Sequence, residues 1–260
     1  QAETLISCHA SLYNNKRTEF LQKLISITPM GLNKAFLSNS GAESVECAIK
    51  LARKFTGKTE IIAVMGGYHG KTMGALSATW DKKYRQPFEP LVPEFKHVPP
   101  DNLEKLAEAI TDKTAAVLLE PIRGEGGVRV PPDDFLPGVR KLCDEKNVLL
   151  ILDEVQTSFG RTGKMFGCDH WCVIPDVMCL AKPFAGGLPI GITVSTEDIM
   201  SSLKIGEHST TFSGSPLVCA AACAAINALV KDKLADRAAA LGGYFKAKLE
   251  ELQAKYKIVK

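Results

Sequence analysis

Residues 148–152 read VLLIL, an unbroken apolar run, and Asp153 and Glu154 follow it directly. This is the most strand-like run in the chain. A strand that is apolar on both faces is typical of a sheet covered by helices on both sides. The run therefore predicts a central buried strand with an acidic pair where the strand ends.

Strands and helices alternate on either side of this run. Short apolar runs predict further strands at 60–65, 115–119, 177–180 and 190–194. Helical spacing of apolar residues predicts helices at 42–55, 103–110 and 135–146, and from Pro216 the chain is Ala-rich and helical almost to Lys260. Such alternation indicates the α/β class, with a mostly parallel sheet and helices on both faces. Sites in such sheets lie in the loops after the carboxyl ends of the strands.

The composition is that of a soluble globular protein with one large domain rather than two equal ones. Of the 260 residues, 45% are hydrophobic and 23% are charged. The net charge of +3 comes from 32 basic and 29 acidic side chains, and this balance gives no support to nucleic-acid binding. We find no apolar run of about 18 residues, so we expect no membrane contact.

The eight cysteines indicate reduced, buried thiols in a cytoplasmic protein rather than a disulfide framework. They form no Cys-x-x-Cys pair, and several lie in apolar runs. Cys168 and Cys172 with His170 could be read as metal ligands. Because no second ligand pair occurs at zinc-like spacing, we expect no metal site.

Two loops contain small residues in positions that suit ligand binding. Ser40, Gly41 and Ala42 stand directly before the helix predicted at 42–55, where free N–H groups and the helix dipole favour an anion. A plain helix cap is the alternative, with Glu43 completing a capping box. Tyr68 and His69 are bracketed by glycines after the strand at 60–65, which suits stacking on a flat ring, although such a pair is also common in ordinary turns.

Two reactive side chains follow predicted strands. Asp153 could bind a protonated heterocycle nitrogen, hold Mg²⁺ or form a structural ion pair, and the absence of a phosphate-binding Walker motif argues against Mg²⁺. Lys182 is delivered by an apolar strand into a glycine-rich turn. A lysine among apolar residues tends toward the neutral amine that attacks a carbonyl, whereas a lysine at a strand end can also simply reach into solvent.

Together these four features are much more specific than any one of them. An anion cradle, a stacking aromatic, a buried acid and a lysine occur in this order along an α/β chain. They match the phosphate, the ring, the pyridine nitrogen and the aldehyde of pyridoxal 5'-phosphate (PLP). The order therefore predicts PLP as the cofactor.

The sequence resembles the class III aminotransferases of fold type I, the family of ornithine, acetylornithine and 4-aminobutyrate aminotransferases. The resemblance runs from about residue 12 to about residue 229. It is carried by SNSGAESVECAIKLAR (38–53), GGYHGKTMGALSAT (66–79), EPIRGEGG (120–127), LDEVQTSFGRTG (152–163), PDVMCLAK (175–182), GGLPIG (186–191) and STTFSGSPL (209–217). Within the family, residues 74–99 look most like acetylornithine aminotransferases of the archaeal type.

The resemblance implies a role for each matching residue. Lys182 would hold PLP as a Schiff base and then move a proton between substrate and cofactor. Asp153 would pair with the pyridinium nitrogen, Gln156 would hydrogen-bond the phenolic oxygen, and Tyr68 would stack on the ring with support from His69. Ser40, Gly41 and Ala42 would bind the phosphate, and Thr211 would reach the phosphate of a neighbouring subunit in a homodimer. Glu120 would lie beside the substrate and help one site accept two substrates.

The resemblance also implies the fold and its divisions. It predicts the fold type I large domain, with a seven-stranded sheet, truncated at both ends. Residues 1–30 would be an N-terminal connecting segment, 31–232 the PLP-binding large domain, and 233–260 the start of a cut-off C-terminal small domain. Pro183 departs from the small residue usual after the lysine and requires a turn that needs no N–H there.

The implied reaction is transfer of an amino group from N-acetylornithine or a related ω-amine to 2-oxoglutarate. Another class III donor remains open, namely ornithine, 4-aminobutyrate or carrier-bound lysine. A PLP-dependent aminomutase or decarboxylase is a second alternative. A non-catalytic homologue that serves as a dimerisation module is a third, motivated by Pro183 and the missing ends.

Overall fold

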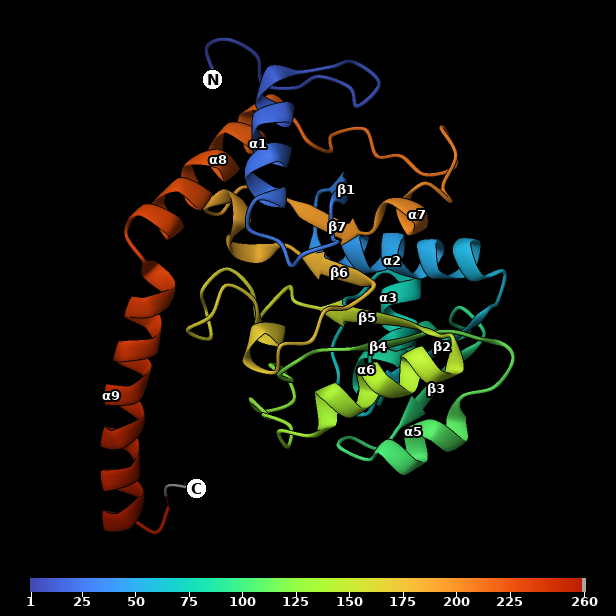
Figure 1. Cartoon of the computed structure of the whole chain (residues 1–260), viewed down its shortest axis with the longest axis vertical. Helices are drawn as coiled ribbons and strands as arrows, with labels where there is room; N and C mark the ends of the chain where they lie inside the picture. Colours follow the sequence, from blue (N-terminus) through green and yellow to red (C-terminus); the bar gives the residue numbers. More distant parts are fainter. Residues whose placement is uncertain (259–260) are drawn as a thin grey trace.

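The computed structural model describes residues 1–258 and is built around one sheet (Figure 1). Its order is β1-β7-β6-β5-β4-β2-β3. The strands are β1 (Lys34–Ser38), β2 (Glu60–Val64), β3 (Phe95–Val98), β4 (Thr114–Leu119), β5 (Leu149–Asp153), β6 (Val177–Leu180) and β7 (Gly191–Ser195). Within the described chain, only β7 pairs antiparallel, with β1 and β6. The predicted α/β class and mostly parallel seven-stranded sheet are confirmed.

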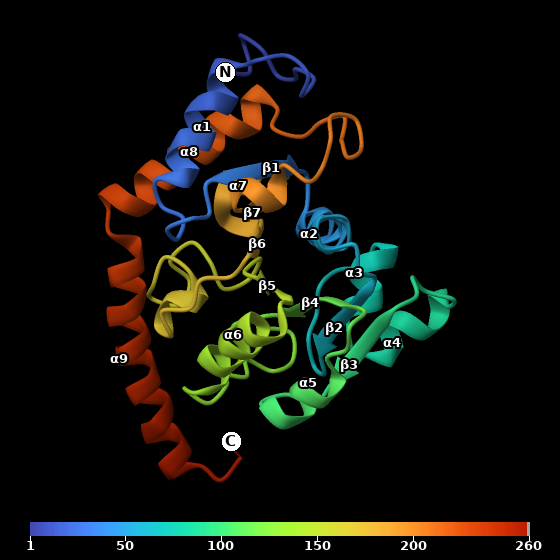
Figure 2. The same cartoon turned by 45° about the vertical axis from the view of Figure 1, so that its right-hand side comes forward.

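Helices cover both faces of the sheet, as predicted (Figures 1 and 2). One face packs against α2 (Gly41–Thr56), α3 (Met73–Ala78) and α7 (Glu197–Met200), whose apolar side chains form one core cluster with the strands. The other face packs against α1 (Asn15–Ile25), α5 (Leu103–Ala109), α6 (Phe135–Lys146) and α8 (Pro216–Lys231) in a second cluster. Strands β2, β4 and β6 are buried along their whole length because they lie between these two layers.

Several short helices lie in the loops around the sheet. They are α4 (Lys82–Arg85) and the 3₁₀ helices η1 (Gln86–Phe88), η2 (Gly167–His170) and η3 (Lys182–Ala185). Of these, η3 bears directly on the predicted site, because its first residue is Lys182. The connection from β6 to β7 therefore carries the lysine on a defined turn.

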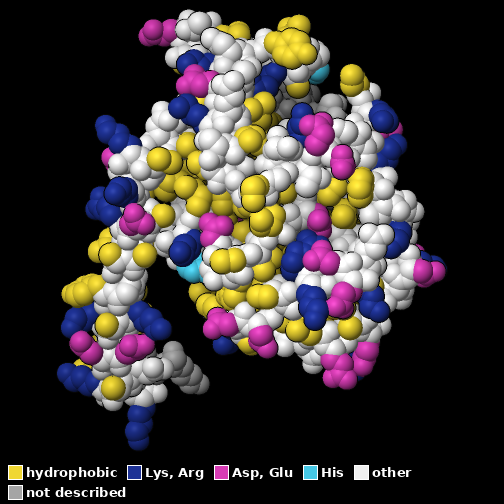
Figure 3. All heavy atoms as spheres, viewed as in Figure 1, with side chains coloured by type: hydrophobic (Ala, Val, Ile, Leu, Met, Phe, Trp, Pro, Cys, Tyr) yellow, Lys and Arg dark blue, Asp and Glu magenta, His cyan; other side chains and the backbone are white. Residues whose placement is uncertain are grey.

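The helical region predicted after Pro216 consists of two helices. Helix α8 ends at Lys231, Lys233 takes a left-handed φ of 49°, and α9 (Leu234–Lys255) follows. Helix α9 has no buried residue and extends along one side of the body (Figure 2). Apolar side chains lie both on α9 and on the body beside it (Figure 3).

The structure bears on membrane-spanning helices, metal sites and the state of the cysteines. Among residues 1–258, no helix is long and apolar enough to span a bilayer. The same residues contain no group of three or more His, Cys, Asp or Glu side chains placed to hold a metal ion. All eight cysteines are free thiols, and Cys168 is buried whereas Cys172 is exposed.

Candidate active site

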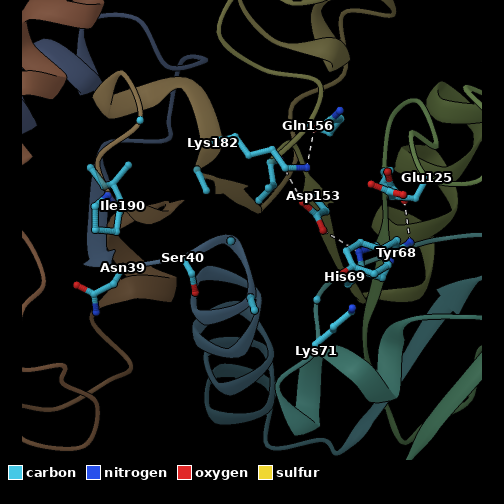
Figure 4. Close-up of a pocket in the computed structure, with 18 of the residues that line it drawn as sticks. Asn39, Ser40, Tyr68, His69, Lys71, Glu125, Asp153, Gln156, Lys182 and Ile190 are labelled. Carbon is cyan, nitrogen blue, oxygen red and sulfur yellow. Dashed lines mark hydrogen bonds and ion pairs between the residues drawn. The ribbon is translucent and has the colours of Figure 1, made fainter. Parts of the chain in front are cut away.

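A cavity of about 430 Å³ opens where β2, β5 and β6 end and α2 begins (Figure 4). This is the edge of the sheet at which α/β folds place their sites. The cavity is lined by all the expected site residues except Thr211, namely Ser40, Gly41, Ala42, Tyr68, His69, Glu120, Asp153, Gln156 and Lys182. The sheet thus brings together residues that lie up to 142 positions apart in the sequence (40 to 182).

The first turn of α2 forms one wall of the cavity. The Ser40 hydroxyl accepts a hydrogen bond from the Glu43 amide at 3.2 Å and donates to the Glu43 carboxylate at 2.9 Å. The plain helix cap is therefore present and occupies the Ser40 hydroxyl, but the capping box is not completed, because the Glu43 carboxylate accepts from the Asn39 amide at 2.9 Å instead of the Ser40 amide. The cap leaves the amides of Gly41 and Ala42 available, because the first N–H groups of a helix have no partner within it.

The loop between β2 and α3 forms the opposite wall and carries Tyr68 and His69. The Tyr68 amide donates to Glu120 Oε1 at 2.9 Å, and its ring meets that of Tyr84 edge to face, with centroids 5.7 Å apart. Burial raises the pKa of the Tyr68 phenol, and the charges of Glu125 and Tyr84 add to this rise. Tyr68 is therefore a neutral ring held in a fixed place at the cavity.

Gly70 brings this loop onto the start of α2. Its φ is 131°, and a Cβ there would lie 2.7 Å from the Ala42 Cβ. Only glycine permits both the backbone conformation and the close approach. The two walls of the cavity are thus in direct contact at this point.

Asp153 and His69 form a buried pair at the floor of the cavity. His69 Nδ1 lies 2.8 Å from Asp153 Oδ2, and the residues are 3% and 4% exposed. Burial alone lowers the pKa of His69, but the hydrogen bond and charge of Asp153, together with Glu120, outweigh it and raise the pKa above its usual value. Asp153 Oδ1 accepts only from the Val155 amide among the described residues, at 3.1 Å.

Glu120 joins the loop after β4 to the loop that carries Tyr68. Its two carboxylate oxygens accept from the amides of Tyr68 and Gly124 at 2.9 and 3.0 Å. Burial raises its pKa, and the nearby charge of Asp153 adds to this, while His69 and the two amides act in the opposite direction. Glu120 is therefore a buried acid at the wall of the cavity, 7% exposed.

Lys182 reaches the cavity from the first position of η3. Its φ of 31° lies in the left-handed region, which is strained for a residue with a side chain. Its Nζ donates to Gln156 Oε1 at 2.5 Å. The expectation of a lysine surrounded by apolar groups is wrong for this chain, because Lys182 is exposed. The flanking apolar residues Leu180 and Phe184 point into the core instead.

Pro183 fits this turn without the loss of a backbone hydrogen bond. It stands in the first turn of η3, where an N–H has no partner within the helix. The Phe184 amide donates to Ala181 O at 3.1 Å and closes the turn. The departure at 183 therefore leaves the lysine in the cavity wall.

Thr211 lies outside the cavity and is exposed. Its neighbour Thr210 receives a hydrogen bond from Asn39 Nδ2 at 2.7 Å. The segment before α8 therefore touches the residue that precedes the anion site. The expected contact of Thr211 with a neighbouring subunit stays a prediction.

Sequence reasoning missed several residues that line the cavity, among them Asn39, Lys71, Val155 and Ile190. Lys71 adds a second cation to the cavity, and its ammonium lies 5.1 Å from the centre of the Tyr84 ring. The sequence held a signal, because Lys71 follows directly on the quoted Gly66–Gly70 loop. Glu125 also lines the cavity and stood without a role in the quoted motif EPIRGEGG.

Comparison with known proteins agrees with the resemblance. The sequence pattern of the family described as Aminotransferase class-III matches residues 1–260. An acetylornithine aminotransferase of Methanopyrus kandleri is 52% identical over 238 residues, covering 92% of this chain and 61% of the relative. A putrescine aminotransferase of Pectobacterium atrosepticum is 49% identical over 245 residues, covering 90% of this chain and 52% of the relative.

Solved structures share the fold. The ornithine aminotransferase of Toxoplasma gondii, reported with partial occupancy of PLP at its active site, superposes with a TM-score of 0.92 at 37% identity. The match covers 96% of this chain and 61% of that protein. The chain thus spans between about half and two thirds of the length of these relatives.

Proposed function

The chain belongs to the class III aminotransferases, and from that premise we propose that it binds PLP in the cavity and forms the larger part of a transamination site. The observation that carries the proposal is one cavity lined by a lysine amine, a buried carboxylate and two helix-start amides. The amine suits the aldehyde of PLP, the carboxylate suits its ring nitrogen, and the amides suit its phosphate.

The residues of the cavity fit the cofactor on separate grounds. The amides of Gly41 and Ala42 stand at a helix N-terminus, which favours an anion such as a phosphate. Asp153 is buried with one oxygen on His69 and the other facing only the Val155 amide, so it can accept from a protonated ring nitrogen. Tyr68 supplies the flat neighbour that a ring needs.

Each side chain has a defined task in the proposed mechanism. When bound, PLP supplies an electron sink that makes the proton next to the transferred amino group acidic. Lys182 Nζ would hold the cofactor through its aldehyde carbon and, as a free amine, would carry this proton from the substrate carbon to that cofactor carbon. Asp153 would accept from the protonated ring nitrogen, and His69 would hold the Asp153 carboxylate in place through the hydrogen bond between them. Gln156 would donate from its side-chain amide to the phenolic oxygen.

The proposed amino donor is N-acetylornithine or a related ω-amine, and the proposed acceptor is 2-oxoglutarate. The name of the Methanopyrus relative supports this choice. Lys71 supports a substrate with a carboxylate, because it places a cation in the cavity in addition to Lys182. Glu120 is a buried acid that lines the same cavity, and it would help one site accept the two substrates in turn.

A second donor class has its own support. The Pectobacterium relative is named a putrescine aminotransferase, and putrescine has no carboxylate for Lys71. Spectra of single half-reactions with N-acetylornithine, ornithine, 4-aminobutyrate and putrescine separate these donors. A change in cofactor absorbance with N-acetylornithine alone supports the first proposal, and a change with putrescine alone rejects it.

The remaining alternatives differ in chemistry or have none. An aminomutase or decarboxylase would share the cofactor but would not pass an amino group to 2-oxoglutarate. A dimerisation module without activity would show no cofactor absorbance that depends on Lys182. The defined turn around Pro183, which keeps Lys182 in the cavity wall, favours an enzyme over that module.

The assembly and the domain limits belong to the same proposal. The active form is a cytoplasmic homodimer in which Thr211 contacts the phosphate site of the neighbouring subunit. Residues 1–30 connect, 31–232 form the PLP-binding domain, and 233–260 begin a smaller domain. The exposed position of Thr211 supports the dimer contact. The break in the helical region at Lys233 supports the domain limit between residues 232 and 233. Sedimentation of the wild-type protein and of Thr211→Arg tests the dimer.

A further inference from the structure

Glu46 joins the two walls of the cavity at a point that the proposed mechanism does not use. It lies in α2, between the anion site and the middle of the helix. Its Oε1 accepts hydrogen bonds from the Thr72 hydroxyl at 2.6 Å, the Gly74 amide at 2.8 Å and the Ala75 amide at 3.1 Å. One carboxylate of α2 therefore holds the beginning of α3.

Helix α3 depends on this carboxylate for its cap. Its own N-cap residue, Thr72, makes no side-chain bond to the helix backbone. The amides at a helix start need an acceptor, and a negative charge there also favours the helix dipole. A Cβ on Gly74 would overlap the Glu46 carboxylate, so glycine at 74 allows the close approach. Glu46 thus replaces the local cap from a different helix.

The loop that carries Tyr68 has two halves with different attachments. Its first half is tied down by Glu120 at the Tyr68 amide and by the Thr79 hydroxyl at the His69 amide, both at 2.9 Å. Its second half, from Lys71 to Met73, is exposed. The Thr72 hydroxyl attaches this half to Glu46 of α2, and the Gly74 and Ala75 amides attach the start of α3 that follows it.

The contact of Gly70 with Ala42 and the hydrogen bonds of Glu46 both affect the distance between the Tyr68 loop and the anion site. Gly70 rests on Ala42 in the anion cradle, and Glu46 lies one turn further along the same helix. We propose that Glu46 is a positioning residue that holds residues 70–75 against α2 and thereby fixes the stacking ring of Tyr68 relative to the anion site. The inference rests on the proposed binding of PLP, because that cofactor would span the two walls.

The test compares Glu46→Ala and Glu46→Gln with Glu60→Ala as a matched control. Like Glu46, Glu60 accepts a hydrogen bond from a threonine hydroxyl, that of Thr114, and it pairs with Lys96. Glu60 is buried whereas Glu46 is half-buried, and Glu60 lies at the end of β2 away from the cavity. The measurements are the dissociation constant of PLP, the visible circular dichroism of the bound cofactor, and hydrogen exchange at 73–78 without cofactor.

We expect Glu46→Ala to weaken PLP binding about tenfold, to lower the dichroism and to speed exchange at 73–78, because charged hydrogen bonds are lost. Glu46→Gln keeps an acceptor oxygen and should bind within about threefold of wild type. Glu60→Ala should lower the unfolding temperature and leave binding and dichroism unchanged. Equal binding by wild type and Glu46→Ala, or equal effects of Glu46→Ala and Glu60→Ala, would overturn the inference.

Thr72→Val serves if Glu46→Ala does not fold. Thr72 is exposed, so this substitution removes one hydrogen-bond donor to Glu46 with little risk to folding. It should speed exchange at 73–76 and weaken PLP binding about twofold to threefold, and unchanged values would overturn the inference. A wild-type protein that binds no PLP would overturn the proposed function instead, while exchange at 73–78 still decides whether Glu46 holds the loop.

Discussion

His69 Nδ1 lies 2.8 Å from Asp153 Oδ2, and both residues are almost fully buried. A buried carboxylate without a partner is unfavourable, and His69 provides that partner from a different loop. Because the pKa of His69 is raised, its protonated form is favoured by folding. The pair therefore links the stability of the site to pH.

Replacing His69 with Asn should lower the free energy of unfolding in a pH-dependent way. A histidine with a raised native pKa contributes stability fully below its unfolded pKa of about 6.5, and this contribution is lost as pH rises through the native value. The difference in unfolding free energy between wild type and His69→Asn should shrink as pH rises. Urea unfolding at a series of pH values between roughly 5.5 and 9 measures it. A difference that does not vary with pH contradicts the assigned role.

His97 is the natural control because its pKa is shifted the other way. Burial lowers the pKa of His97 to about 4, and its Nε2 lies 3.0 Å from Ala78 O. Its contribution to stability is present above about pH 6.5 and is lost as pH falls toward about 4. His97→Asn should therefore give a difference that shrinks on acidification.

A methyl group at Gly41 should disturb the anion site. A Cβ there would lie 2.8 Å from Val155 Cγ1, so the helix start or Val155 must move. We expect Gly41→Ala to weaken PLP binding about tenfold, because displacing the amides of residues 41 and 42 weakens their hydrogen bonds to the phosphate. Titration of the protein with PLP measures it.

Gly242→Ala is the control for this change. No atom lies within 4 Å of a Cβ at Gly242, which stands in the interior of α9. Alanine there should raise the free energy of unfolding by at most about 1 kcal/mol through helix propensity. PLP binding should stay as in wild type, and equal weakening by both variants contradicts the role of Gly41.

Glu154 should contribute to stability although it adjoins Asp153. It is 0% exposed and accepts hydrogen bonds from the amides of Gly167 and Cys168 at 2.8 and 2.7 Å and from the Thr157 hydroxyl. Glu154→Ala leaves these donors buried without an acceptor and should cost about 2–5 kcal/mol of unfolding free energy. Glu251→Ala, which removes an exposed pair with Lys248, should change it by less than about 1 kcal/mol. Similar values for both variants contradict the assignment.

Lys71 should discriminate among amino donors. Lys71→Met should raise KM about tenfold for donors with a carboxylate, because a charge-assisted contact is lost. KM for putrescine should stay unchanged. Lys83→Met is matched, because the Lys83 ammonium lies 4.6 Å from the centre of the same Tyr84 ring but Lys83 does not line the cavity. An equal rise for all donors contradicts a role in recognising a carboxylate.

The central strands could be predicted from sequence because burial on both faces leaves a plain apolar run, as in residues 148–152. The edge strands β1 and β3 gave no such signal. Their sequences, KAFLS and FKHV, are partly exposed and mix polar with apolar residues. A domain limit was placed between residues 232 and 233, but the left-handed backbone of Lys233 that separates α8 from α9 could not be foreseen, because no helix-breaking residue marks it.

Cavity residues such as Ser40 and Asp153 could be predicted because they stand directly before a helix or at the end of a strand. The exposure of Lys182 could not, because its apolar neighbours in sequence, such as Leu180 and Phe184, turn into the core. The links between loops were also out of reach. The hydrogen bonds from the Tyr68 amide to Glu120 and from the Gly74 amide to Glu46 join residues 52 and 28 positions apart, which only the folded chain brings together.

The most direct test of the central claim is the visible absorbance of the purified protein with PLP, for wild type and Lys182→Ala. The account predicts a band of covalently bound cofactor in the wild type that survives gel filtration and is absent from Lys182→Ala, which still binds PLP reversibly through Gly41, Ala42 and Asp153. The same band in both proteins would contradict it.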